Sequence, residues 1–147
     1  MQSQKEIPLS RLFIHCGILG WCFEILYTSL RMLQRRNYRL QGNTSIWMFP
    51  IYGCAAFLRP LNKVMHHFSV FFRGIVYTLL IYTGEYFSGK FLDKKQMIPW
   101  NYDRARLRIC RYIRLDFFPF WFLVGLIFEH FNLHNGFSGI KHAKTHS

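Results

Sequence analysis

Long apolar runs separated by clusters of basic residues are the feature that most constrains this chain. Hydrophobic residues make up 51% of its 147 positions, and 19% are Phe, Tyr or Trp. A soluble core of this size cannot hide so much apolar surface, because a small domain leaves much of its surface exposed. The net charge of +12 comes from basic residues between the runs, which is typical of a membrane protein with basic loops. A nucleic-acid-binding protein would be basic but would lack such runs.

The apolar runs predict an all-α fold, an integral membrane bundle of four transmembrane helices in a single domain over residues 1–131. A transmembrane helix needs about 20 mostly apolar residues. The second run is short, because Arg59 and Pro60 interrupt it. It spans the bilayer only if residues 45–63 are helical and Arg59 and Lys63 snorkel to the headgroups; otherwise it is re-entrant or interfacial. The predicted spans are residues 12–33, 45–63, 68–92 and 112–131, followed by a polar tail, 132–147, that we expect to be disordered.

The basic loops also predict an orientation. The loops after the first and third spans hold most of the Lys and Arg residues, and such loops face the cytoplasm. We therefore expect a multi-pass protein of the cell membrane whose termini lie outside. The first run lacks a small-residue cleavage site and contains Glu24, which indicates a retained span rather than a signal peptide.

The sequence offers little that is typical of an enzyme. Its four cysteines form no CxxC pair, so we expect no zinc site, no disulfide framework and no cofactor. Residues 84–90 have the spacing of a phosphate-binding loop, but Phe91 stands where Ser or Thr would hold magnesium. No HExxH spacing is present. We expect a protein without catalytic activity.

Four of the seven acidic residues lie inside or at the edge of predicted spans. A carboxylate in the middle of a bilayer costs about 2.5–3.5 kcal/mol on insertion scales, so such residues usually face the bundle interior and mark functional sites. The structural alternative is a hydrogen bond to a neighbouring helix or an ion pair with Arg73. Asp116 is the weakest candidate, because Arg114 can solvate it. The four residues are Glu24, Glu85, Asp116 and Glu129.

Helical spacing groups small and polar residues with two of these carboxylates. Trp21 and Thr28 share a face with Glu24, beside Gly17, Gly20 and Arg31, and Thr78 shares a face with Glu85, beside Gly74, Ser88 and Gly89. Small residues beside a carboxylate suit close helix packing around a polar centre, although packing alone would equally explain the glycines. The candidate substrate or ion site comprises Glu24, Glu85, Glu129, Trp21, Thr28, Tyr52 and Thr78.

Five arginines crowd the segment before the fourth predicted span, with apolar residues between them. Such a segment suits the membrane interface, where each charge contributes about 1 kcal/mol of attraction to anionic headgroups. A solvated loop is the alternative. The candidates for contact with anionic lipids are Arg104, Arg106, Arg108, Arg111 and Arg114.

The order of five short motifs resembles that of a known family. The motifs are Gly20-Trp21-Cys22-Phe23-Glu24, Pro50-Ile51-Tyr52-Gly53, Glu85-Tyr86, Trp100-Asn101-Tyr102 and Arg108-Ile109-Cys110. The chain resembles the bacterial family labelled ABC-transporter type IV permeases and is similar to the animal membrane proteins called transmembrane protein 229. This resemblance implies a multi-span membrane protein whose ATPase, if it has one, is a separate chain. Asn101 and Leu107 depart from the Asp and Gly usual in the family.

Three functions are compatible with these features. In the first, the chain is a transporter component with Glu24 and Glu85 as a proton or cation site, and it forms a homo-oligomer or joins other membrane subunits. In the second, it is a non-catalytic subunit or scaffold whose carboxylates pin helices together. In the third, it is a membrane enzyme acting on lipids, with one of these glutamates as acid or base, His15 as a helper and the arginines holding phosphate. Its expected partners are the bilayer and anionic lipids, and not nucleic acid.

Overall fold

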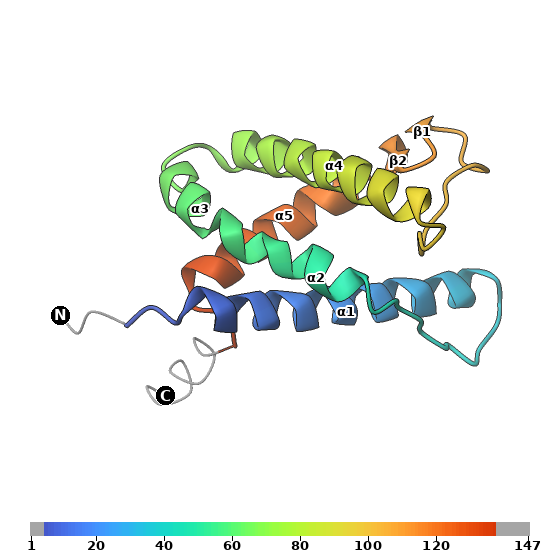
Figure 1. The fold of residues 1–147 in the computed structure, drawn as a ribbon, viewed down its shortest axis with the longest axis horizontal. Helices are drawn as coiled ribbons and strands as arrows, with labels where there is room; N and C mark the ends of the chain where they lie inside the picture. The colour runs from blue at the N-terminus through green and yellow to red at the C-terminus, as the bar shows by residue number, and fades with distance from the viewer. Residues whose placement is uncertain (1–4, 138–147) are drawn as a thin grey trace. The chain divides into compact units, whose positions relative to one another are not determined.

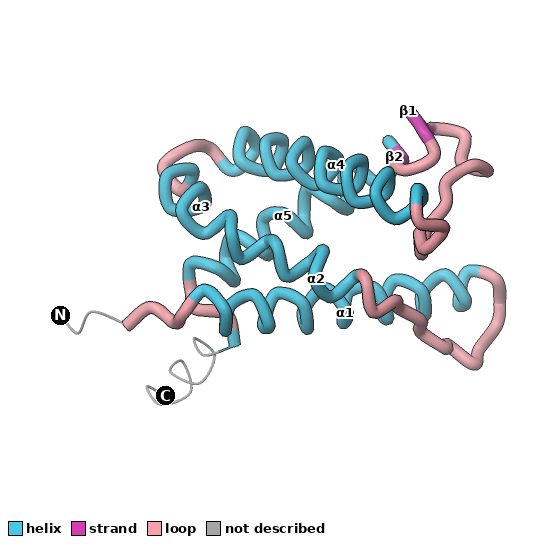
Figure 2. Tube along the Cα trace, in the orientation of Figure 1, coloured by secondary structure: helices cyan, strands magenta, loops and turns pink. Residues whose placement is uncertain are grey.

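The computed structural model describes residues 5–137, which are mostly helical (Figures 1 and 2). By their contacts they divide into two compact units, one formed by the residues up to 60 and those from 131 on, the other by residues 61–130. The elements in order are α1 (Leu9–Gln34), α2 (Met48–Gly53), the 3-10 helix η1 (Cys54–Leu58), α3 (Arg59–Met65), α4 (Val70–Lys94), β1 (Arg108–Cys110), β2 (Ile113–Arg114), the 3-10 helix η2 (Leu115–Phe117) and α5 (Phe118–Leu133).

Helix α1 is the longest helix of the first unit. It has 26 residues, and among the described residues it is the one helix long and apolar enough to cross a membrane. Helix α2 runs alongside it (Figure 1). The two helices pack closely because Gly17 lies against the ring of Phe49 and Gly20 against Tyr52, where any side chain would overlap the aromatic ring.

The second predicted span is helical from Met48 to Met65 but in three pieces. The 3-10 stretch ends two residues before Pro60, whose missing N–H and bulky ring disrupt α-helical hydrogen bonding to the preceding turn. Arg59 does not snorkel outward as expected. It is 8% exposed, and its Nη1 donates a hydrogen bond of 2.9 Å to the carbonyl of Ile7, so the chain before α1 supplies the oxygen that a headgroup would have offered.

In the second unit, helices α4 and α5 meet through glycines. The Ser69 side chain caps α4 by accepting a hydrogen bond from the Phe72 N–H. Gly74 of α4 lies against the ring of Phe122, and Gly125 of α5 lies against Tyr77. Helix α5 has 16 residues, fewer than the roughly 20 of a helix that crosses the bilayer.

Helix α5 begins at Phe118, six residues after the predicted start of the fourth span. Residues 112–117 instead complete a small antiparallel hairpin, which the sequence did not predict, and a 3-10 turn (Figure 2). The Tyr82 hydroxyl fixes this segment by donating to the carbonyls of Arg114 and Leu115. Pro119 then lies in the first turn of α5, where its missing N–H costs nothing.

The end of α5 belongs to the core of the first unit rather than to a polar tail. Asn132 is 1% exposed. Its Nδ2 donates to the carbonyl of Ala55 at 2.8 Å, and its Oδ1 accepts from the Cys16 thiol at 3.3 Å. The sequence analysis assigned Asn132 to the tail because the residue is polar, and polarity alone does not indicate a buried role. Residues 138–147 of the predicted tail lie outside the described residues.

We expect Asn132→Ala to lower the free energy of unfolding by about 1–3 kcal/mol, because it leaves the buried carbonyl of Ala55 without its donor. Thermal or denaturant unfolding of the purified protein in detergent would measure this loss. The matched control is Asn37→Ala, at an exposed position whose side chain accepts only a local N–H from Arg39. Equal stability of the two variants would contradict the role given to Asn132.

Candidate polar site

Glu24 is held by a tyrosine from the neighbouring helix. The Tyr52 hydroxyl on α2 donates a hydrogen bond of 2.7 Å to Glu24 Oε1 on α1. Gly20, one turn before Glu24, allows the tyrosine ring to lie against α1. A half-buried carboxylate on an apolar helix thus has a short hydrogen bond to a neutral donor, an arrangement that can hold either an anion or a proton.

The surroundings of Glu24 tie α1 to the loop before α2. Trp21 Nε1 donates to the carbonyl of Ser45 at 3.0 Å. The Thr28 hydroxyl accepts from the Asn43 N–H at 2.8 Å and also lies 2.8 Å from the carbonyl of Glu24. Beside them is an open apolar groove of about 400 Å³, lined by Trp21, Ile46, Trp47, Phe49 and Pro50. Four predicted site residues, Trp21, Glu24, Thr28 and Tyr52, therefore lie together.

Glu85 on α4 also has a tyrosine partner. The Tyr102 hydroxyl, from the loop after α4, lies 3.5 Å from Glu85 Oε1, a long hydrogen bond. Three residues earlier on the same helix, Tyr82 bonds to the segment before α5. Thr78 is not part of this group. It is fully buried, and its hydroxyl donates to the carbonyl of Gly74 on its own helix.

Glu129 forms a buried ion pair. Arg73 Nη1 on α4 lies 2.9 Å from Glu129 Oε1 on α5, and the side chains are 13% and 5% exposed. The same nitrogen lies 3.4 Å from His66 Nδ1. Because Arg73 satisfies this carboxylate, its geometry matches the structural alternative, an ion pair between helices. Glu129 joins neither the Glu24 group nor the Glu85 group.

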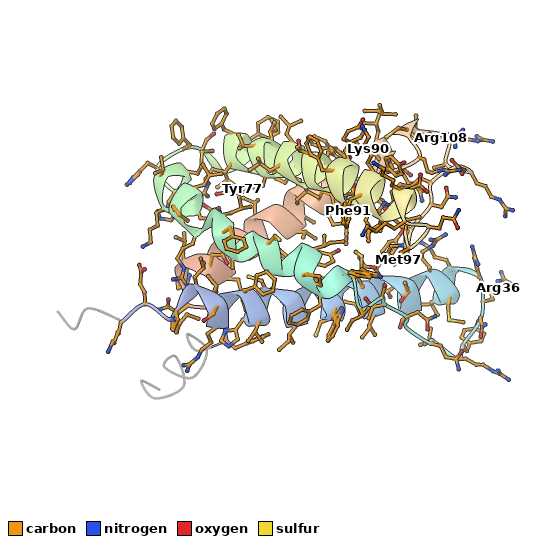
Figure 3. The ribbon with its side chains drawn as sticks, in the orientation of Figure 1. Arg36, Tyr77, Lys90, Phe91, Met97 and Arg108 are labelled. Atoms are coloured by element: carbon orange, nitrogen blue, oxygen red, sulfur yellow. The ribbon has the colours of Figure 1, made fainter. Side chains whose placement is uncertain are left out.

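Three of the five clustered arginines are paired with carboxylates near the hairpin, and Arg108 is labelled in Figure 3. Arg108 pairs with Asp103 at 3.1 Å, Arg111 with Asp103 at 3.2 Å and with Asp93 at 3.3 Å, and Arg114 with Asp116 at 2.6 Å. Arg104 and Arg106 are exposed, and within residues 5–137 they make no ion pair. Contact of this cluster with anionic lipids stays a prediction.

These pairs change the acidity of the aspartates. Hydrogen bonding from Asn101, and then from Arg111, lowers the pKa of Asp103, and hydrogen bonding from Arg114 lowers the pKa of Asp116. Both carboxylates remain charged at neutral pH. Whatever stability these pairs give is present above the ordinary aspartate pKa and is lost as the pH falls below it.

The sequence missed several partners of the site residues. Tyr102 was noted only as part of a short motif, and no site role was predicted for Asn43, Ser45 or Asn132. Tyr102 lies in the loop eight residues beyond the end of α4, and its contact with the half-buried Glu85 spans 17 positions of the chain. The others act through backbone groups or from distant parts of the chain, which no local pattern shows.

We expect Arg73→Ala and Glu129→Ala each to lower the free energy of unfolding by about 3–5 kcal/mol, because each leaves the charge of the other residue buried without its partner. The double variant should lose less than the sum of the two, which a double-mutant cycle in detergent would measure. Asp103→Ala is the control, since it breaks pairs that are about 40% exposed and should cost no more than about 1 kcal/mol. Strictly additive losses at Arg73 and Glu129 would contradict the pairing.

Comparison with known proteins gives a family but no relative of known structure. No solved structure matches the chain. A family model described as "Putative ABC-transporter type IV" matches residues 11–144, nearly the whole sequence. The match covers both units and every candidate site residue named above. The chain therefore belongs to the ABC-transporter type IV family.

Proposed function

We propose that this protein is the membrane-embedded permease component of a transport system, in which intramembrane carboxylates form a polar site for a proton or cation. Four helical segments would span the bilayer, the second as the broken helix of residues 48–65 and the fourth as η2 together with α5, residues 115–133. Family membership supports the membrane location and the transport role. The hydrogen bond between Glu24 and Tyr52 is the observation that carries the proposal.

The position of Glu24 along α1 is what makes this hydrogen bond informative. Glu24 lies fifteen residues after Leu9 and ten before Gln34, which is about 22 Å and 15 Å along a helix. The hydrocarbon core is about 30 Å thick, so α1 crossing the bilayer holds Glu24 well inside it. A carboxylate at that depth is costly without a partner, and Tyr52 supplies one.

A transport role implies partners. Four spans enclose little room for a transport pathway within one chain, so the chain would act as a homo-oligomer or with other membrane subunits. An ABC system also requires an ATPase, which a separate chain would supply. On the proposed topology the two basic loops face the cytoplasm, where such an ATPase would dock.

A scaffold is the second candidate, and the Arg73–Glu129 pair favours it. That pair shows that a carboxylate inside this protein can serve to join two helices. If Glu24 and Glu85 do the same, the protein holds partner helices and moves no ion. Glu24→Gln would then leave co-purifying membrane subunits unchanged.

Proton flux into vesicles tests the proposal. We expect purified protein in liposomes with an entrapped pH dye to admit protons under a potassium diffusion potential. Glu24→Gln should reduce this flux to the rate of protein-free vesicles, because an amide cannot exchange the proton of a carboxyl group. Insertion and oligomeric state of the variant should match those of the wild type.

The control for this assay is Glu6→Gln, the same chemical change at a side chain that is 54% exposed and precedes α1. It should leave the flux unchanged. Wild-type flux in Glu24→Gln would refute the transport role of this carboxylate and favour the scaffold.

A further inference from the structure

The two long helices of the chain match in length and in the position of a glutamate. Helix α1 has 26 residues and α4 has 25. Glu24 lies fifteen residues after the first residue of α1, and Glu85 lies fifteen residues after the first residue of α4. When the two helices are aligned from their first residues, only three pairs are identical: Ile14 with Ile75, Leu19 with Leu80, and Glu24 with Glu85. The sequence therefore shows no obvious repeat.

An aromatic residue lies three positions before each glutamate, and in both helices its side chain donates a hydrogen bond to a backbone carbonyl. Trp21 Nε1 donates to the carbonyl of Ser45 at 3.0 Å, and the Tyr82 hydroxyl donates to the carbonyl of Arg114 at 3.1 Å. In both units the donor therefore ties the long helix to the segment that leads into the next helix. A tyrosine from a later segment then donates to the carboxylate, Tyr52 to Glu24 and Tyr102 to Glu85.

The C-terminal ends of α1 and α4 have the same backbone geometry. Arg36 and Gln96 have positive φ values of 55° and 57°, an uncommon conformation for residues other than glycine. The N–H of each bonds to a carbonyl three residues back at 2.9 Å, and the next N–H, of Asn37 or Met97, bonds to a carbonyl five residues back at 2.9 Å. This is a Schellman ending formed twice without glycine. Arg36 and Met97 are labelled beyond their helices in Figure 3.

From these five correspondences we propose that each unit repeats one plan, and that Glu24 and Glu85 are equivalent sites that bind one proton each. The proposal rests on the transport role given to Glu24 and extends it to a stoichiometry of two per chain. A proton suits the geometry, because a carboxylate bonded to a phenol becomes neutral on taking up a single proton. A hard metal cation such as Ca²⁺ would need six or more oxygen ligands.

The charged and titratable groups around the two carboxylates differ modestly. Glu24 faces the Tyr52 phenol from α2. Glu85 faces Tyr102 from the loop, and Tyr82 lies within electrostatic range of both Glu85 and Asp116. Asp116 is itself paired with Arg114. The hydrogen bonds described for these two glutamates come from phenols, whereas Glu129 is bonded by the guanidinium of Arg73.

Labelling with dicyclohexylcarbodiimide tests the proposal, because this lipophilic reagent reaches membrane interiors and adds to protonated carboxyl groups. Full-length protein in lipid nanodiscs would be treated with excess reagent, and adducts would be counted by intact mass and located by peptide mapping. We expect two adducts per chain, at Glu24 and Glu85. Glu129 should remain unlabelled, since the guanidinium of Arg73 occupies its carboxylate.

Two tyrosine variants provide matched controls. Tyr52→Phe removes a donor that favours the charged carboxylate, so labelling at Glu24 should become faster by about threefold or more while Glu85 is unaffected. Tyr102→Phe should do the same at Glu85 and leave Glu24 unaffected, with a smaller increase because its hydrogen bond is longer.

One adduct, no adduct, or a tyrosine variant that changes both sites would overturn the equivalence. Labelling of Glu24 alone, with proton flux still abolished in Glu24→Gln, would leave the proposed function standing and remove only the second site. If Glu24→Gln has the proton flux of the wild type while both glutamates are labelled, the transport role is refuted and the repeated plan of the two units stands.

Discussion

The cost of holding a carboxylate on an apolar helix governs the arrangement of this protein. Each of the three glutamates within its long or apolar helices is met by a donor from another segment: Tyr52 at Glu24, Tyr102 at Glu85 and Arg73 at Glu129. The close helix contacts at Gly20 and Gly74 bring the backbones near enough for side chains to reach across. The donors differ in kind. A guanidinium fixes a negative charge in place, whereas a phenol leaves the protonation state of its carboxylate open.

The sequence was most informative where local periodicity decides the structure. The first and third apolar runs became α1 and α4, with ends within three residues of those expected. The face shared by Trp21, Glu24 and Thr28 also persists, because spacing of three and four on a helix requires it. Whether the four carboxylates act as predicted stays a prediction, as does the number of spans.

The remaining features depend on contacts that are distant in sequence. Asn132 bonds to residues 77 and 116 positions away, so its polarity suggested a tail when it belongs in a core. The start of α5 was misplaced because Tyr112 and Ile113 continue an apolar run by composition while Tyr82 holds the adjacent backbone in a hairpin and turn. The basic cluster looked uniformly charged, yet Asp93, Asp103 and Asp116 neutralise part of it.

The place of Asn132 in the first unit also bears on how the chain is made. Residues 131–137 complete a core whose other members lie before residue 61, so α1 emerges from the ribosome long before the side chain that closes its packing. Until then Cys16 and the carbonyl of Ala55 lack a buried partner. The packing of the first unit is therefore completed only when the last segment has been synthesised. A product that ends before Asn132 would leave this core incomplete, and cellular quality control could recognise the exposed surface.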